Sequence, residues 1–381
     1  MKAVIRRIPD RVVVPAVIAM VVAVGFVGLR LGVAAHGDSS RFAVVGRVYA
    51  DPAQVPEGLH VFEGGDGSGY DGQFFYRLAL DPTRVDVDRS HGITVDNILR
   101  NGRVGYPVLA WTLSAGGQPA AVPWALIALN VAGLGAIGAL GGLLAQRYGH
   151  HAIAGLLLTA YWGFTFTLSR DLSEIIAATA TLGALVLLRD RRWILGGGAF
   201  ALAVLIREQV LIMAGLLVLC SIVTEHHAEH RPEARPSPSE RWDRWKPAVA
   251  IIPPVVALIG WNLVVRHAAG KMPLTSSSNA NLGPPFVGLL SAMGVWLDGV
   301  RSGGTGDRYL SALNFVQLAT LVLIVGLVAR NHRATRAGGE LWIAVAGISL
   351  FAVSLTENVL GAPASFRTVY DVYLVSVVAL L

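Results

Sequence analysis

The residues best suited to take part in a reaction lie in a glycine-rich stretch, residues 64–82, with the sequence GGDGSGYDGQFFYRLALDP. The stretch carries two carboxylates, Asp66 and Asp71, on a backbone whose glycines allow close approach to a ligand. A carboxylate held beside a bound hydroxyl group can act as a general base. Asp71 is the stronger candidate because an ordered segment follows it directly, whereas Asp66 is surrounded by glycines.

The segment after Asp71 predicts a short amphipathic helix lying at a membrane interface. Pro82 ends its pattern, and three pairs of side chains recur at i and i+4: Phe74 with Leu78, Phe75 with Ala79, and Arg77 with Asp81. Asp71 would then stand at the helix N-cap, where its side chain could accept backbone N–H groups without any catalytic role. A calcium-binding loop fits less well, because the twelfth position of such a loop is Arg77 instead of Glu.

The composition places these residues in a membrane protein. Of the 381 residues, 54% are hydrophobic and only 15% are charged, and the mean hydropathy is +0.56. Soluble domains carry about 25% charged residues. We therefore predict an all-α polytopic membrane protein with a single transmembrane domain over residues 1–381. Cys220 is the only cysteine, so no intramolecular disulfide is possible.

We predict ten transmembrane helices, because a span needs roughly 20 apolar residues to cross ~30 Å of hydrocarbon. The first span is longer than the 7–15 apolar residues of a signal peptide. The last span ends without a polar tail, which is typical of a chain that continues past Leu381. The spans cover residues 12–35, 120–145, 152–168, 172–188, 193–206, 210–223, 247–265, 309–329, 341–355 and 369–381.

Basic residues divide the loops into two groups. With the N-terminus in the cytoplasm, every short basic cluster falls on the cytoplasmic side, as the positive-inside rule requires. The net charge of +6 is then a topology signal, and no nucleic-acid partner is implied. The cytoplasmic loops are residues 146–151, 189–192, 225–246 and 329–336; the extracytoplasmic ones are residues 36–119, 169–174, 207–209, 266–308 and 356–367.

Acids and arginines converge on the extracytoplasmic side, and one turn tests this idea. Residues 193–224 are almost continuously apolar, with Arg207 and Glu208 at their middle. Placing both at the centre of a bilayer would cost about 2.5–3.5 kcal/mol each. Two short spans that meet at this turn avoid the cost, provided that protein encloses the turn or that it lines a wet cavity. A purely structural ion pair between Arg207 and Glu208 is the alternative.

Two further features have weaker functional readings. His226, His227 and His230 could bind a metal, but their Arg- and Pro-rich surroundings favour a solvated linker. Residues 284–300 predict a second interfacial helix, or one that simply packs on neighbouring spans.

These features together resemble the GT-C superfamily of polyprenyl-phosphate-dependent glycosyltransferases, chiefly over residues 12–223. GYPVLAWTLSAGG, residues 105–117, resembles the juxtamembrane segment before the second span of protein O-mannosyltransferases and lipid A aminoarabinose transferases, although Tyr106-Pro107 replaces a His-Pro-Pro motif. SRDLSE, residues 169–174, is similar to the polar turn after the third span. YDGQFFYRLALDP is closest to an uncharacterised bacterial branch, and Gly72 stands where better-known members carry a second acid.

The resemblance implies an inverting glycosyltransferase in the bacterial plasma membrane, with its active site on the extracytoplasmic side. It would move a sugar from a polyprenyl-phosphate donor to a glycan, glycolipid or protein acceptor. Asp71 maps to the general base, and arginines suit the departing phosphate. The candidates are Arg170, Arg207 and Arg367 for the phosphate, and Asp66, Asp171, Glu174 and Glu208 for sugar hydroxyls or a divalent cation, Mg²⁺ or Mn²⁺.

Two other classes of function stay open from the sequence. A lipid or small-molecule transporter or flippase would show broken helices with intramembrane charges at corresponding positions of two halves. Only the Arg207 turn offers such a feature, and the second half of the chain lacks its counterpart. A non-catalytic protein with the same fold is the other possibility.

Overall fold

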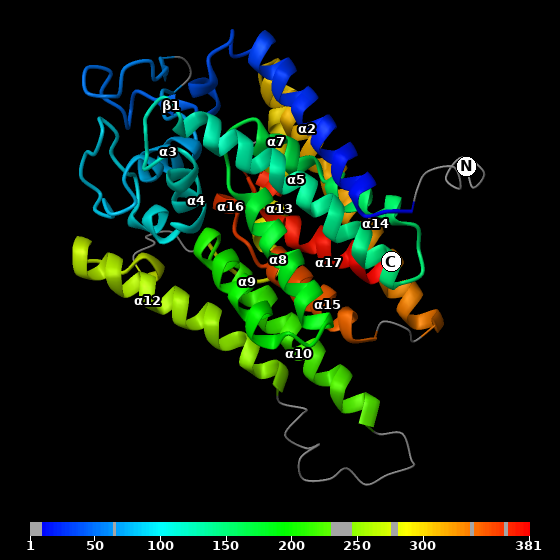
Figure 1. Cartoon of the computed structure of the whole chain (residues 1–381). Coiled ribbons are helices and arrows are strands. Elements are labelled where there is room, and N and C mark those ends of the chain that lie inside the picture. Colours follow the sequence, from blue (N-terminus) through cyan, green and yellow to red (C-terminus); the bar gives the residue numbers. More distant parts are fainter. Residues whose placement is uncertain (1–9, 64–65, 230–245, 276–280, 336–338, 362–364) are drawn as a thin grey trace.

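The chain forms a bundle of helices with an irregular region at one end (Figure 1). The structure, a computed structural model, describes residues 10–63, 66–229, 246–275, 281–335, 339–361 and 365–381. His230, Gly64 and Gly65 lie outside the described residues, as do the side chains of His226 and His227.

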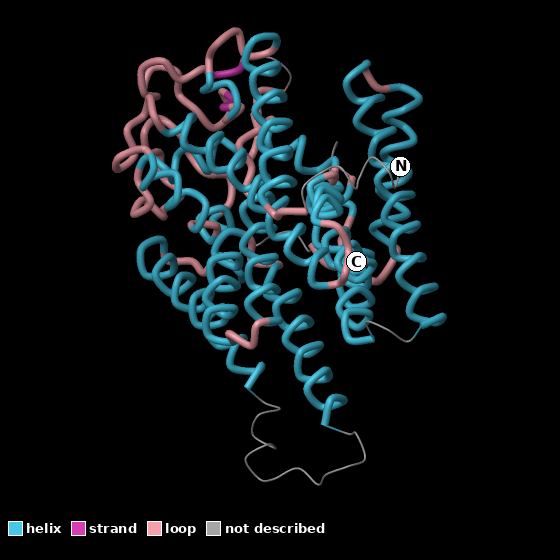
Figure 2. Tube along the Cα trace, turned by 45° about the vertical axis from the view of Figure 1, so that its right-hand side comes forward, coloured by secondary structure: helices cyan, strands magenta, loops and turns pink. Residues whose placement is uncertain are grey.

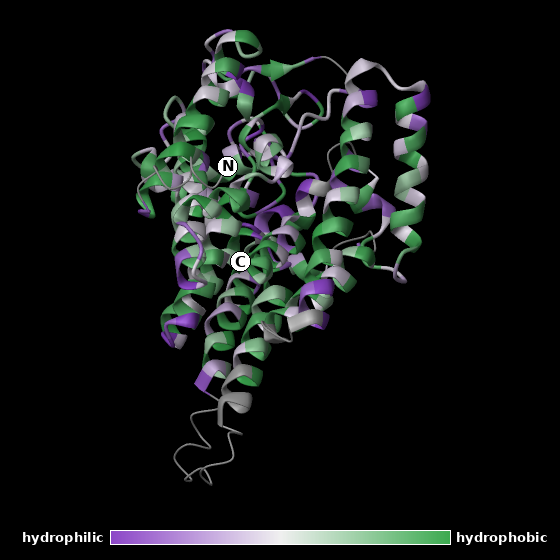
Figure 3. Cartoon of the chain, turned by 90° about the vertical axis from the view of Figure 1, so that its right-hand side faces the viewer, coloured by the Kyte–Doolittle hydropathy of each residue, from purple (hydrophilic) through white to green (hydrophobic). Residues whose placement is uncertain are grey.

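Four helices among the described residues are long and apolar enough to cross a membrane. Hydrophobic residues make up much of the length of the helices in the bundle (Figure 3), and Val22, Val256 and Leu323, on three of the four, are more than 60% exposed. Apolar side chains on the outside of a bundle are typical of a protein that faces lipid. The four are α2 (Val13–Val33), α5 (Val122–Arg147), α12 (Ile252–Ala269) with the preceding 3-10 turn η4 (Lys246–Ile251), and α14 (Thr305–Thr335).

Further apolar helices pack among these four. Most of the predicted spans coincide with a helix, so the expectation of an all-α membrane architecture is confirmed. Several of these helices are shorter than the roughly 20 residues of a complete span, and the count of ten stays a prediction. They are α8 (Glu174–Arg189), α9 (Trp193–Ile206), α10 (Val210–Glu229), α15 (Gly339–Val353) and α17 (Tyr370–Leu380).

The predicted span over residues 152–168 is not one continuous helix. It consists of the 3-10 turn η3 (Ala152–Gly155), α6 (Leu156–Thr159) and α7 (Trp162–Leu168). Tyr161 has extended backbone angles between the last two pieces. At Gly155 this segment packs closely against α5, because a Cβ atom there would lie 2.1 Å from the amide nitrogen of Gly142.

The long connection between α2 and α5 holds most of the irregular structure. Its two short strands, β1 (Val45–Gly46) and β2 (Val61–Phe62), pair in parallel, with Val45 opposite Val61. Figure 2 shows these strands within the loops at one end of the molecule. The same connection contains η1 (Ser39–Phe42), α3 (Gly72–Leu80), η2 (Ile98–Gly102) and α4 (Gly105–Leu113).

Helix α3 is present where a short amphipathic helix was predicted, but protein encloses both of its faces, and a position at the membrane interface stays a prediction. All nine of its residues are buried. Arg77 can be buried because its guanidinium finds acceptors in the following loop, including Ile93 O at 3.1 Å and Asp88 O at 2.9 Å. Phe75 packs edge-on against Tyr106 of α4, with ring centroids 5.4 Å apart. The helix is therefore the core of this region.

Contacts between described loops lie at both ends of the bundle. At one end, Asp10 accepts a hydrogen bond from Ala152 N at 2.7 Å, and Arg147 lies 3.0 Å from Asp190. At the other end, Arg103 pairs with Glu208 from the turn between α9 and α10. These contacts agree with the predicted grouping for the loops that they join; the full grouping, and which end faces the cytoplasm, stay predictions.

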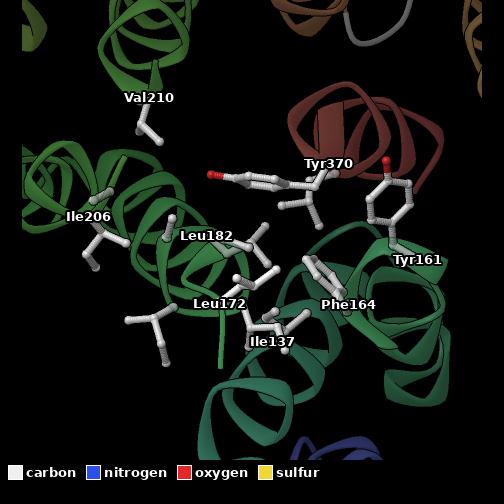
Figure 4. Packing of buried hydrophobic residues seen from close by; sticks show 14 of the residues in the cluster. Ile137, Tyr161, Phe164, Leu172, Leu182, Ile206, Val210 and Tyr370 are labelled. Carbon is white, nitrogen blue, oxygen red and sulfur yellow. The ribbon is translucent and has the colours of Figure 1, made fainter. Parts of the chain in front are cut away.

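A hydrophobic core places the C-terminal segments beside this second end. Ile137, Phe164, Leu172 and Tyr370 pack together from α5, α7, the loop before α8, and α17 (Figure 4). Phe164 and Tyr370 have ring centroids 6.2 Å apart. Because α17 is buried among these helices, the 3-10 turn η6 (Ser365–Val369) that precedes it is carried to the site described below.

The helix expected over residues 284–300 is present as α13 (Val287–Ser302). Trp296 on this helix donates a hydrogen bond to Leu360 O at 2.9 Å, at the end of the short helix α16 (Glu357–Leu360). Leu290, on another face, is 66% exposed. The helix packs on its neighbours through one side, and membrane contact through the other side stays a prediction.

Candidate functional site

A cavity of about 760 Å³ lies between the long α2–α5 connection and the turns at the same end of the bundle. One part of its wall is charged, with the arginines Arg100, Arg103, Arg207 and Arg367 and the acids Asp71, Asp96 and Glu208. Another part is apolar and comes mostly from helices, with Leu211, Ile212, Leu258, Phe351 and Val359, together with Leu355 between α15 and α16. The cavity therefore offers charged and apolar contacts to the same ligand.

Asp71 is held in place by tight packing on both sides of it in sequence. A Cβ atom at Gly72 would lie 2.4 Å from Arg170 O and 2.8 Å from Ala43 O, so only glycine allows this approach. Gln73 fixes the preceding loop, because its Oε1 accepts from Gly46 N at 3.1 Å and its Nε2 donates to Ser68 O at 2.8 Å. The glycine-rich stretch is thus locked to β1.

The Asp71 side chain does not cap helix α3. Its backbone is already helical, and the side chain makes no capping hydrogen bond. Instead, Oδ1 lies 2.8 Å from Nη1 of Arg100 and Oδ2 lies 3.2 Å from Nη2 of Arg367. Burial alone would raise the pKa of Asp71, but the surrounding arginines, Arg100 and Arg367 first among them, outweigh it and lower the pKa to about 2. Asp71 is therefore an ionised carboxylate at the cavity wall.

Glu174 forms ion pairs with two of the arginines predicted to bind phosphate. It is only 1% exposed, and its Oε1 lies 2.8 Å from Nη1 of Arg207 and 3.0 Å from Nε of Arg367. Thr167 Oγ1 donates to its other oxygen at 3.2 Å. Arg367 also donates to the hydroxyl oxygen of Tyr70. The sequence suggested that Glu174 contacts a sugar or cation, but in the structure it lies beneath the cavity and orients Arg207 and Arg367.

The Arg207 turn is enclosed as the insertion energetics require. Arg207 is 5% exposed, and Glu208 pairs with both ends of the Arg103 guanidinium at 2.9 and 2.7 Å. Burial would raise the pKa of Glu208, but Arg103 outweighs it and lowers the pKa to about 2. Gln209 donates to Thr368 O at 2.8 Å and joins the turn to η6. The turn thus lines the cavity, and Arg207 and Glu208 each pair with a different partner.

Besides Glu174, three of the predicted site residues do not line the cavity. The Arg170 guanidinium stacks over the Phe166 ring at 3.9 Å and donates to Ser169 Oγ at 2.8 Å. Asp66 faces solvent, where it accepts hydrogen bonds from the Ser68 amide and hydroxyl at 2.9 and 2.8 Å. Asp171 is fully buried. In this structure none of the three side chains contributes to the cavity wall.

Asp171 is unusual in its own right. Its φ of +48° is rare for a residue with a side chain. Neither carboxylate oxygen has a hydrogen-bond partner within the described part of the chain. Burial raises the pKa of Asp171 well above the ordinary value of 3.8. The candidate cation ligands are therefore dispersed, and the described residues contain no group of three His, Cys, Asp or Glu side chains suited to a metal ion.

Sequence reasoning missed Arg100 and Arg103. Arg100 donates two hydrogen bonds to Asp96, from Nε to Oδ1 at 3.1 Å and from Nη2 to Oδ2 at 3.2 Å. Its Cζ lies 5.0 Å from the centroid of the Phe74 ring. Both arginines immediately precede the juxtamembrane segment at residues 105–117. Two arginines three residues apart, on the same side as Asp71, were the available signal.

No protein-family model, curated protein or solved structure matches this chain.

Proposed function

We propose that this protein is a membrane glycosyltransferase of the GT-C type, which moves a sugar from a polyprenyl-phosphate donor to an acceptor hydroxyl group. The observation that carries the proposal is the two-part wall of the cavity. Arginine side chains suit a phosphate, because the guanidinium can form paired hydrogen bonds to its oxygens. Leu211, Leu258 and Phe351, on the helices α10, α12 and α15, offer an apolar surface to the first part of a lipid tail.

The reaction begins with the acceptor hydroxyl group beside Asp71. Asp71 takes its proton, and the acceptor oxygen forms a bond to the anomeric carbon of the donor sugar from the side opposite the phosphate. The bond between that carbon and the phosphate oxygen breaks, and the lipid phosphate leaves with the electron pair. Configuration at the anomeric carbon is inverted. The role of a general base suits Asp71 because it is ionised and faces the cavity.

Arg207 and Arg367 are assigned to the departing phosphate. Both line the cavity, and Glu174 holds each of them in a fixed orientation. Donors that are already oriented stabilise developing charge without reorganising during the reaction. Arg170 has no part in this assignment, because it stacks on Phe166. The basic loops at the opposite end favour an extracytoplasmic site in a bacterial plasma membrane.

Transfer from defined donors tests the proposal directly. The full chain would be reconstituted in liposomes with a panel of radiolabelled polyprenyl-phosphate sugars and with candidate glycan, glycolipid and peptide acceptors, with and without Mg²⁺ or Mn²⁺. We expect labelled product and free polyprenyl phosphate from the wild type, and neither from the Asp71→Asn variant. Glu57→Gln is the matched control, because Glu57 is an exposed acid of the same connection.

A transporter or flippase would give a different result in the same assay. The lipid phosphate would bind, no sugar would be released from any donor, and Asp71→Asn would behave like the wild type. That combination would contradict the proposed transfer reaction.

A further inference from the structure

The two arginines that hold Asp71 are anchored very differently. Arg367 is 8% exposed and is bound by three partners from two segments, Glu174 in one and Tyr70 and Asp71 in the other. Arg100 lies on the 3-10 turn η2, its side chain is 25% exposed, and its other carboxylate partner, Asp96, comes from four residues earlier in the chain. Arg367 is therefore the more buried of the two arginines, and Glu174 ties it to a distant segment of the chain.

This double contact conflicts with the role of a base. A carboxylate whose pKa is about 2 accepts a proton poorly, since the efficiency of a general base rises with its basicity. Both Asp71 oxygens are occupied by guanidinium groups. Each oxygen keeps a second lone pair for an acceptor hydroxyl group, and release of one guanidinium would make the carboxylate a stronger base.

We propose, building on the transferase function above, that the phosphate of the incoming donor displaces Asp71 from Arg100, so that donor binding itself releases the base. Arg100 has one nitrogen on Asp71 and two on Asp96. A phosphate oxygen that takes over Nη1 leaves the contacts to Asp96 intact. The exchange frees Oδ1 of Asp71, while Arg367 still orients the carboxylate through Oδ2.

The charge balance around Asp71 favours the same outcome. The groups that influence its carboxylate are Arg100 and Arg103 near η2, Arg207 in the turn after α9, Arg367 in η6 and Glu174 at the start of α8. Loss of the Arg100 contact and arrival of a phosphate anion both favour the neutral form of Asp71. The base is therefore weak in the empty cavity and gains basicity when the donor is in place, which protects the empty site from ligands other than the donor.

Infrared spectroscopy of Asp71 tests the exchange in the wild-type protein. The full chain, with ¹³C-labelled aspartate carboxyl groups, would be placed in lipid nanodiscs and titrated with acid, and Asp71→Asn would assign the Asp71 band. We expect saturating farnesyl phosphate to raise the pKa of Asp71 by about 1 to 3, the range that an adjacent arginine contributes. Farnesol, which has the same tail without a phosphate, should leave the pKa unchanged. Inorganic phosphate is a separate arm, and an equal effect from it would support the exchange while removing the need for a lipid.

An Arg100→Gln variant provides the second measurement. Its Asp71 should have the raised pKa before any ligand is added, and farnesyl phosphate should then change it little. Arg89→Gln is the matched control, because Arg89 pairs with Asp51 outside the cavity. If farnesyl phosphate binds saturably but does not change the pKa read from the Asp71 band, the proposed exchange is wrong, whereas the proposed donor site is still supported. If farnesyl phosphate does not bind, both the exchange and the proposed function fail.

Discussion

Arg367 reaches Asp71 across 296 residues of sequence, with its Nη2 atom 3.2 Å from Oδ2 of the carboxylate. The contact joins the last turn before the C-terminal helix to the glycine-rich stretch near the start of the chain. Neither residue is positioned by its neighbours in sequence alone. Gly72 packs Asp71 against the Arg170 turn, and the buried helix α17 places Arg367.

Replacing Asp71 with Asn should slow catalysis strongly while keeping the site intact. Asn has nearly the same shape but cannot take the acceptor proton, so we expect the transfer rate to fall by about 10²- to 10⁴-fold. Farnesyl phosphate should still bind, because Arg207 and Arg367 remain held by Glu174. Rates in liposomes and calorimetric binding measure the two effects. Near-normal turnover by a folded Asp71→Asn protein would show that Asp71 is not the base.

Arginine-to-lysine variants should distinguish the arginines that line the cavity from Arg170, which lies outside it. Arg207→Lys and Arg367→Lys lose the planar fork that suits a phosphate. We expect each to weaken farnesyl phosphate binding by about 10- to 100-fold, as for the loss of one hydrogen bond to a charged group. Arg170→Lys should bind like the wild type, since Arg170 lies outside the cavity. Equal losses in all three variants would contradict the assignment.

The Arg103–Glu208 ion pair should make stability depend on acidic pH. The pKa of Glu208 is lowered from 4.5 to about 2 in the folded protein. Its contribution is therefore present above pH 4.5 and is lost as the pH falls toward 2. We expect Glu208→Gln to melt below the wild type at pH 6, and the gap to narrow at pH 3. Thermal melts in detergent measure this, with Glu57→Gln expected to follow the wild type throughout.

Gly72→Ala should destabilise the protein through packing alone. The new methyl group would overlap Arg170 O and Ala43 O, and overpacking of this kind costs about 1–3 kcal/mol. Gly183→Ala is the matched control, because no atom lies within 4 Å of a Cβ at that helical position. The control should be neutral or should gain up to about 1 kcal/mol from helix propensity. Denaturation of both variants side by side measures the difference, and equal stability would mean that the contact at Gly72 is relaxed easily.

The orientation of the bundle is open to a labelling test. In a Cys220→Ala background, Ala53→Cys should react with a membrane-impermeant maleimide from the extracytoplasmic side, and His150→Cys only after the membrane is permeabilised. Both positions are exposed at opposite ends of the bundle. The reverse pattern would invert the topology and move the cavity to the cytoplasmic side.

Strong physical constraints made part of the site predictable from sequence. Arg207 and Glu208 interrupt a long apolar run, and the high cost of burying charge in a membrane requires a turn there. Asp71 stood out because it joins a glycine-rich segment to a helical pattern. The positions of the helices followed from apolar segments, since few other structures tolerate such composition.

The direction of individual side chains was beyond the reach of the sequence. Arg170 and Arg207 both lie at the same end of the bundle, but only packing decides that one stacks on Phe166 and the other lines the cavity. Arg100 and Arg103 lie in an irregular connection with no period to show which face they occupy. The burial of α3 depends on acceptors for Arg77 that come from a loop.

The pairing of charges in the cavity also affects how a ligand arrives. Arg100, Arg103, Arg207 and Arg367 are matched in number by Asp71, Asp96, Glu174 and Glu208, all within ion-pair distance of an arginine. The net electric field of such a site is weak outside the cavity, so the site does not steer a distant anion toward it. Capture of a lipid phosphate would then depend on lateral diffusion within the membrane and on short-range exchange of partners. Its association rate should consequently vary little with ionic strength, unlike that of a site with unpaired arginines.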